Sequence, residues 1–135
     1  MNALVWDASA AVKLVVEETG SGRARTLFAQ PVQHYTLDWS AAEVASALWK
    51  RALRSGAEPG AVLLAFDTFG KLDFRVADAE GLTGPALRLA LGERHPIYDC
   101  IYIWLAMEHG APLVTADARQ ASLAERVGLE VHFLG

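Results

Sequence analysis

The sequence predicts an α/β protein, a three-layer α/β/α sandwich with a mainly parallel central sheet. Three observations support this fold class. The chain has 135 residues, enough for a single domain over residues 1–135 with a substantial core. Short apolar runs alternate with longer segments of helical periodicity, and Gly, Pro and Ser separate them. Such alternation is typical of βαβ units, whose strands lie parallel in one sheet.

The first elements predicted are a strand and two helices. Residues 3–6 form a short apolar run that ends at Asp7 and predicts a buried strand. A helix over 8–17 follows the strand. The Gly-Ser-Gly segment at 20–22 ends this helix, and a second helix is predicted over 23–30.

The middle of the chain predicts a strand over 34–37 and a long helix over 40–54. In this helix small or apolar residues recur at i, i+4, i+7 and i+11, the spacing of one helical face. These residues are Ala41, Ala45, Leu48 and Ala52. A shorter helix over 61–69 and a strand over 72–76 complete this part of the chain.

The last part of the chain predicts a long apolar helix over 98–109, which follows Pro96 and stops at Gly110. Before it, the Gly-Pro pair at 84–85 lies within or just before a helix that ends near Leu91. The remaining elements are a strand at 112–115, a helix at 118–127 and a strand at 130–133.

Composition restricts the function classes. The formal net charge of −4 argues against a protein that coats nucleic acid by bulk charge, although an enzyme can bind it locally. Cys100 is the only cysteine, so no internal disulfide is possible, and a reducing compartment fits. We see no signal peptide and no apolar run long enough for a membrane helix, so we expect a cytoplasmic protein without membrane contact.

Four acidic residues fall at one predicted edge of the sheet, where the carboxyl ends of parallel strands and the N-termini of helices meet. They are Asp7, Glu43, Asp99 and Asp117. Carboxylates packed together repel one another unless a cation intervenes, and hard oxygen ligands suit Mg²⁺ or Mn²⁺. Such a site suits phosphodiester hydrolysis.

Each acid also has an ordinary structural explanation. Asp7 and Asp117 could cap the helices that follow them. Ser40 and Glu43 match the S-x-x-E pattern of a capping box, which would turn the Glu43 carboxylate back onto its own helix. Asp99 lies in the first turn of a helix, where the dipole favours an acid. The joint placement at one edge, rather than any single residue, favours a metal site.

These residues resemble the PIN-domain ribonucleases, and in particular the VapC-type toxins of bacterial and archaeal toxin–antitoxin pairs. The resemblance covers essentially the whole chain. It depends on four segments in order: VWDAS at 5–9, SAAEVASAL at 40–48, YDCIYIWLA at 98–106 and LVTAD at 113–117. Trp6 is bulkier than the aliphatic residue expected before the first Asp, which puts the local packing in question.

The resemblance implies a PIN-like fold and an endoribonuclease that uses Mg²⁺ or Mn²⁺ to activate water against an RNA phosphodiester. Asp7, Asp99 and Asp117 would hold the metal, and Glu43 would complete the pocket, directly or by orienting water. Ser9 and Thr115 match hydroxyl positions that support the site, and both could instead be capping residues. The resemblance also implies a homodimer and a cognate antitoxin that covers the toxin.

Two other functions compete with the nuclease. A receiver-type phosphoacceptor domain also places acids at strand ends, but it needs paired acids after the first strand and a Lys after the last. A non-catalytic binding module would use the acids only as caps.

Basic residues give a weaker signal than the acids. Near the predicted edge they are candidates for phosphate contacts, with solvated surface charge as the alternative, and these residues are Lys13, Arg94 and Arg119. A further three, Lys50, Arg51 and Arg54, are interpreted as an ordinary polar face near a helix C-terminus.

Overall fold

Five parallel strands form one sheet in the computed structural model, which describes residues 2–135. The strands are β1 (Ala3–Trp6), β2 (Gln33–Leu37), β3 (Arg75–Ala77), β4 (Leu113–Thr115) and β5 (Val131–Phe133). Their order across the sheet is β3-β2-β1-β4-β5, and every pair of neighbours is parallel. Receiver domains have the order 2-1-3-4-5 instead, so the receiver-type alternative is wrong.

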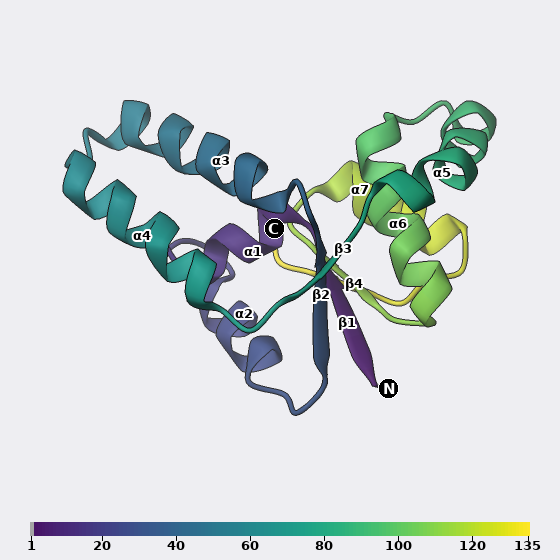
Figure 1. Ribbon diagram of the computed structural model, residues 1–135, viewed down its shortest axis with the longest axis horizontal. Coiled ribbons are helices and arrows are strands. Elements are labelled where there is room, and N and C mark those ends of the chain that lie inside the picture. Colours follow the sequence, from purple (N-terminus) through teal and green to yellow (C-terminus); the bar gives the residue numbers. More distant parts are fainter. Residues whose placement is uncertain (1) are drawn as a thin grey trace.

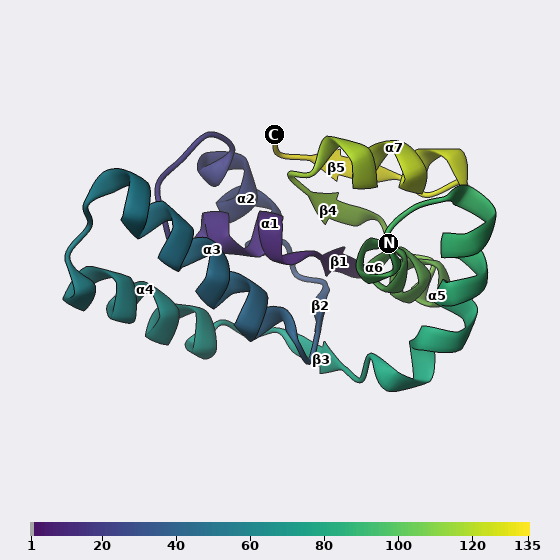
Figure 2. The ribbon, with the colours of Figure 1, turned by 90° about the horizontal axis from the view of Figure 1, so that it is seen from above.

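Helices cover both faces of this sheet (Figures 1 and 2). They are α1 (Ala8–Ala11), the 3₁₀ turn η1 (Val12–Leu14), α2 (Ser21–Phe28), α3 (Ser40–Ser55), α4 (Pro59–Lys71), α5 (Glu80–Glu93), α6 (Ile97–His109) and α7 (Ala118–Arg126). Figure 1 shows α5, α6 and α7 on one side and α1 and α2 on the other, while α3 and α4 form a hairpin that extends outward. The predicted three-layer α/β/α sandwich is confirmed.

The central strand β1 divides the core because its side chains alternate between the two faces. Ala3 and Val5 join the cluster under α5, α6 and α7, whereas Leu4 and Trp6 join the cluster under α1 and α2. Trp6 fits despite its size, since its indole N–H donates to His34 Nδ1 at 3.0 Å and its ring packs edge-on against Phe28. Burial on both sides explains why this strand reads as an uninterrupted apolar run.

The first two helices differ from their predicted ranges. Helix α1 and the η1 turn end at Leu14 rather than at residue 17, and the chain then turns so that Lys13 Nζ reaches the Thr19 carbonyl at 2.6 Å. Helix α2 begins two residues early because the Ser21 hydroxyl holds the preceding loop, donating to the Val16 carbonyl at 2.8 Å. Of the predicted Gly-Ser-Gly break, only Gly20 lies outside a helix. Its φ of 89° is left-handed, and the Leu134 carbonyl occupies the space where a side chain would lie.

Other differences follow from tertiary packing. The predicted stripe on α3 is partly wrong: Ser40, Val44 and Leu48 are the buried residues, whereas Ala41 and Ala45 are exposed. Strand β3 begins at Arg75 rather than at residue 72. Helix α5 runs from Glu80 to Glu93 and contains Pro85 inside it.

Of the helices between residues 2 and 135, none combines the length and the apolar character needed to cross a membrane.

Candidate active site

The candidate site lies where the sheet order reverses, between β1 and β4. Asp7 follows β1, and its backbone N–H donates to the Val114 carbonyl of β4 at 3.1 Å. Asp117 follows β4 by two residues. A reversal of strand order opens a crevice at the carboxyl ends of the strands, because the crossover helices on either side leave in opposite directions. The first and last of the predicted acids, Asp7 and Asp117, therefore follow the two strands that border this ligand-binding position.

Asp7 is the most deeply placed acid, with only 4% of its surface exposed. Its carboxylate accepts hydrogen bonds from Ser9 Oγ at 2.7 Å, Thr115 Oγ1 at 2.6 Å and the Ala10 N–H at 2.9 Å. Burial raises the pKa of Asp7 to about 7, although these hydrogen bonds oppose the shift, and the charge of Asp99 adds to it. Asp7 is thus both the N-cap of α1 and a strongly desolvated carboxylate.

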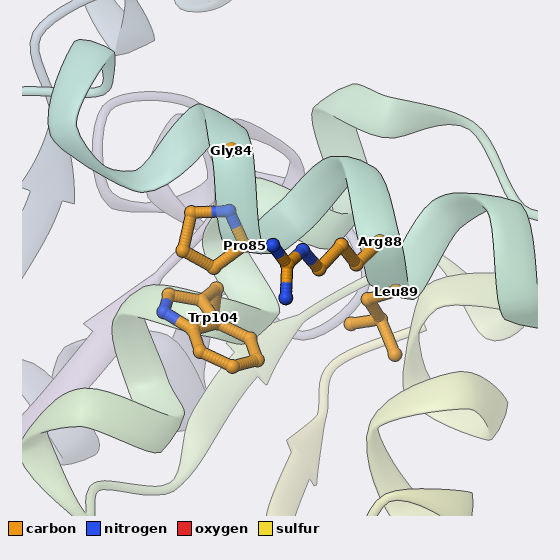
Figure 3. A pocket seen from close by; sticks show the side chains of 5 residues that line it. All are labelled: Gly84, Pro85, Arg88, Leu89 and Trp104. Atoms are coloured by element: carbon orange, nitrogen blue, oxygen red, sulfur yellow. The ribbon is translucent and has the colours of Figure 1, made fainter.

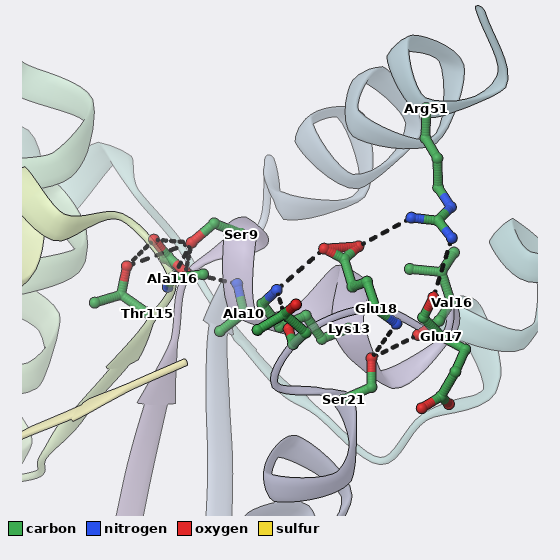
Figure 4. Close-up of polar contacts among 12 residues, drawn as sticks. Ser9, Ala10, Lys13, Val16, Glu17, Glu18, Ser21, Arg51, Thr115 and Ala116 are labelled. Atoms are coloured by element: carbon green, nitrogen blue, oxygen red, sulfur yellow. Dashed lines mark hydrogen bonds and ion pairs between the residues drawn. The ribbon is translucent and has the colours of Figure 1, made fainter. Parts of the chain in front are cut away.

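The two predicted hydroxyls tie β1 and β4 together around Asp7 (Figure 4). Ser9 Oγ also accepts from the Ala116 N–H at 2.9 Å, and Thr115 Oγ1 accepts from the Asp117 N–H at 3.0 Å. Both side chains therefore do more than cap a helix, because each connects the carboxylate of one strand end to the backbone of the other.

Asp99 occupies the first turn of α6, as predicted, and 27% of its side chain is exposed. Its Oδ2 lies 2.8 Å from His95 Nε2, four residues earlier. Burial raises the pKa of Asp99, the hydrogen bond from His95 opposes this, and the charge of Asp117 adds to the rise. His95 was not among the predicted site residues, and its position four residues before an acid was the one available signal.

Asp117 is the N-cap of α7, as the capping alternative proposed. Its Oδ1 accepts from the backbone N–H of Arg119 at 2.9 Å and of Gln120 at 3.3 Å. The side chain of Gln120, almost fully buried, donates to the Asp99 carbonyl at 3.2 Å and so joins α7 to α6. Capping occupies Oδ1 of Asp117, and the residue is half-buried.

Glu43 has a partner that the sequence did not suggest. The capping-box interpretation is wrong, since Glu43 Oε1 accepts from the Tyr102 hydroxyl at 2.6 Å and the N-cap position of α3 belongs to Trp39. The Tyr102 oxygen also lies 2.7 Å from Ser40 Oγ, which in turn lies 2.6 Å from Thr36 Oγ1. Burial and the Glu43 carboxylate raise the pKa of Tyr102, so its phenol remains a proton donor.

Chemically, the acids suit a hard cation that keeps part of its water shell. Within residues 2–135, no three carboxylate, His or Cys side chains lie close enough to form a ready-made cage for an ion. Mg²⁺ does not require such a cage, because it usually binds one or two carboxylates and retains several waters. Asp7 is suited to be one of these carboxylates. It is buried, and its donors are the hydroxyls of Ser9 and Thr115 and the Ala10 N–H.

A cavity of about 700 Å³ lies away from the acids, between α5 and α6. Pro85, Arg88, Leu89 and Trp104 line it (Figure 3). No acid lines this cavity, so it offers none of the chemistry of the candidate site. A smaller pocket of about 330 Å³, lined by Trp39 and Tyr98, lies directly beside Glu43.

The chain is similar to known proteins over most of its length. The family model of the PIN domain matches residues 4–126. Ribonuclease VapC3 from Pyrobaculum aerophilum is 34% identical over 122 residues, which cover 87% of this chain and 92% of the relative.

Three solved structures share the fold. PAE2754 from Pyrobaculum aerophilum superposes with a TM-score of 0.74 at 22% identity, covering 96% of this chain and 83% of that one. VapC20 from Mycobacterium tuberculosis, described as a sarcin-ricin loop cleaving toxin, gives 0.68 at 18% identity, covering 93% and 95%. VapBC2 from Rickettsia felis, bound to promoter DNA, gives 0.66 at 13% identity, covering 98% and 99%.

Proposed function

The chain belongs to the PIN-domain family, and from this premise we propose that it is a metal-dependent endoribonuclease of the VapC type. One observation supports the proposal most strongly. Within residues 2–135, no Lys or Arg side chain forms an ion pair with any of the four acids, although Asp7 and Asp99 are desolvated enough to raise their pKa values. His95 contacts Asp99, but Asp7 has no cationic partner in residues 2–135, and a desolvated carboxylate beside a second acid favours a bound divalent ion.

We assign Asp7, Asp99 and Asp117 to holding Mg²⁺ or Mn²⁺. When bound, the ion would supply Lewis-acid activation of water and neutralise charge that develops on the phosphate. The residues of the chain prepare this site: Ser9 and Thr115 fix the orientation of the Asp7 carboxylate through hydrogen bonds of 2.7 and 2.6 Å.

Glu43 would act as the general base that accepts a proton from the attacking water. Tyr102 holds Glu43 Oε1 at 2.6 Å, which leaves Oε2 free to orient water and accept its proton. Cleavage of this kind would leave a 5′-phosphate and a 3′-hydroxyl on the RNA.

Asparagine substitutions test the proposal. Asp7→Asn and Asp99→Asn remove a charge without changing side-chain size, so we expect both to abolish RNA cleavage while circular dichroism shows the native fold. Glu108→Gln, an exposed acid near the end of α6, is the matched control and should cleave normally. Undiminished cleavage by both Asn variants would overturn the proposal.

Calorimetric titration with Mn²⁺ separates the nuclease from a non-catalytic module of the same fold. The nuclease binds Mn²⁺, and Asp7→Asn binds it more weakly. A folded wild-type protein that does not bind Mn²⁺ would favour the binding module.

The proposal extends to an antitoxin and to a homodimer acting in the cytoplasm, where RNA and the antitoxin are made. The α3–α4 hairpin supports a protein partner, since Trp49, Leu53, Leu63 and Leu64 are each at least 60% exposed. Light scattering of the purified chain tests the homodimer, because a monomeric mass contradicts it. Co-expression with the product of a neighbouring reading frame tests the antitoxin, which should co-purify and stop cleavage.

A further inference from the structure

Two grooves flank the acidic site, and each is lined by several cations. The first, here called the α3 groove, has a volume of about 370 Å³. Its charged lining consists of four cations and one acid, Lys13, Lys50, Arg51, Arg54 and Glu18, and Ser9 and Ala116 line its end near the site. The second, the α7 groove, measures about 350 Å³ and is lined by Glu93, Arg94, His95, Ala118, Arg119, Ser122 and Arg126. Glu93 pairs with Arg126 at 3.4 Å, so Arg94 and Arg119 are the arginines of this groove without an ion pair in residues 2–135.

The two grooves meet the chain on either side of Asp117 in sequence. Ala116, the residue before it, lines the α3 groove, and Ala118, the residue after it, lines the α7 groove. The same division holds for the partners of the other acids. Ser9, which donates to Asp7, faces the α3 groove, whereas His95, which contacts Asp99, faces the α7 groove.

In the α3 groove, Lys13 and Arg51 form a fixed wall (Figure 4). Lys13 is 5% exposed, and its Nζ contacts Glu18 Oε2 at 3.0 Å. Arg51 Nη1 lies 3.6 Å from Glu18 Oε1, and its Nη2 donates to the Glu17 carbonyl at 3.1 Å. Glu18 therefore holds both cations in place, and its single charge leaves the wall with an excess of positive charge.

Lys50 and Arg54 form the open rim of the α3 groove. Both are exposed, and in residues 2–135 neither has an ion pair or a side-chain hydrogen bond. They are four residues apart on α3, so their like charges repel. The helix dipole accounts for a cation in the last turn, such as Arg54, but not for the convergence of Lys50 and the buried Lys13 on the same groove. An anion in the groove would relieve the repulsion.

We propose that the α3 and α7 grooves bind the phosphates on either side of the scissile one, so that a single RNA strand crosses the acidic edge between them. This inference rests on the proposed function, and it specifies the path of the RNA backbone across the site. It also explains how a chain with a net charge of −4 can bind RNA, since its cations gather where the strand passes. The proposal gives Lys50, Arg51 and Arg54 a role beyond the ordinary polar face that the sequence predicts.

Salt-dependent binding tests the inference independently of cleavage. Fluorescence anisotropy with a labelled single-stranded RNA of about 12 nucleotides, long enough for several phosphate contacts, is measured in EDTA over a range of salt concentrations. The variants are Lys50→Gln/Arg54→Gln for the α3 groove and Arg94→Gln/Arg119→Gln for the α7 groove. Lys71→Gln/Arg75→Gln, which alters exposed cations at the end of α4 and the start of β3, is the control with the same change in net charge.

Each groove variant should reduce the slope of log K against log salt by about 1.4, because each phosphate contact on a single strand contributes about 0.7. At about 0.1 M salt this corresponds to binding weaker on the order of tenfold. The control should keep the wild-type slope. Equal loss in the control and groove variants, or an unchanged slope in the groove variants, would overturn the inference.

The failure of this inference and the failure of the proposed function give different results. A wild-type protein that cleaves RNA with Mn²⁺ while the groove variants keep their slope refutes the grooves alone. If the groove variants reduce the slope of log K against log salt but the wild-type protein does not cleave RNA, the grooves bind RNA and the nuclease proposal is refuted.

Discussion

Burial of Asp7 makes the metal-free protein less stable as the pH rises. The carboxyl is 4% exposed, and burial raises its pKa from 3.8 to about 7. Between these values the unfolded chain releases its proton while the folded chain keeps it, so the free energy of unfolding falls with rising pH and levels off above about 7. A shift of roughly three pKa units corresponds to about 4 kcal/mol.

Asp7→Asn should remove this dependence. Asparagine stays neutral, its carbonyl oxygen can still accept from the Ala10 N–H, and the Ser9 and Thr115 hydroxyls can accept from its amide. In EDTA, the variant should therefore resemble the wild type near pH 4 and become more stable by up to about 4 kcal/mol near pH 8. Added Mg²⁺ should narrow the gap at pH 8, because it binds the wild type more tightly and so stabilises it more than the variant.

Urea unfolding followed by tryptophan fluorescence provides the assay, because Trp6 is fully buried. Glu108→Gln controls for the loss of one negative charge at the surface. The decisive quantity is the difference in unfolding free energy between wild type and Asp7→Asn at the two pH values. If that difference is the same at pH 4 and pH 8, the ionised carboxylate is not costly to bury and the reasoning fails.

Three further predictions concern single side chains. Tyr102→Phe removes the donor to Glu43, so kcat should fall about 10- to 100-fold with little change in KM, and an unchanged kcat would show that Tyr102 does not position Glu43. Thr115→Val leaves Asp7 Oδ2 without its 2.6 Å donor, and urea unfolding should show a loss of about 1–3 kcal/mol; a stability equal to wild type contradicts this. Burial raises the pKa of the Cys100 thiol to about 11, so reaction with a thiol reagent should follow the unfolding equilibrium, and rapid reaction of the native protein would refute this.

The elements and their order were predictable because they depend on local pattern. The apolar run at 3–6 matches β1, and the ends of the long apolar helix follow from Pro96 and Gly110, giving α6 within one residue. The predictions failed where distant contacts override that pattern. Helix α2 starts early because Ser21 anchors a neighbouring loop, and the buried face of α3 is set by its neighbours rather than by its alanines.

The sequence by itself determined that Asp7, Asp99 and Asp117 lie at one edge of a parallel sheet, because that edge follows from where strands end and helices begin. Only the tertiary structure decided what surrounds them. Two donors to Asp7 are local, but the third, Thr115, is 108 residues away, and the donor to Glu43 is Tyr102, 59 residues away. The two basic grooves likewise combine cations from separate elements. Periodicity and spacing report on a residue's own element, whereas burial, hydrogen-bond partners and local charge depend on which elements pack together.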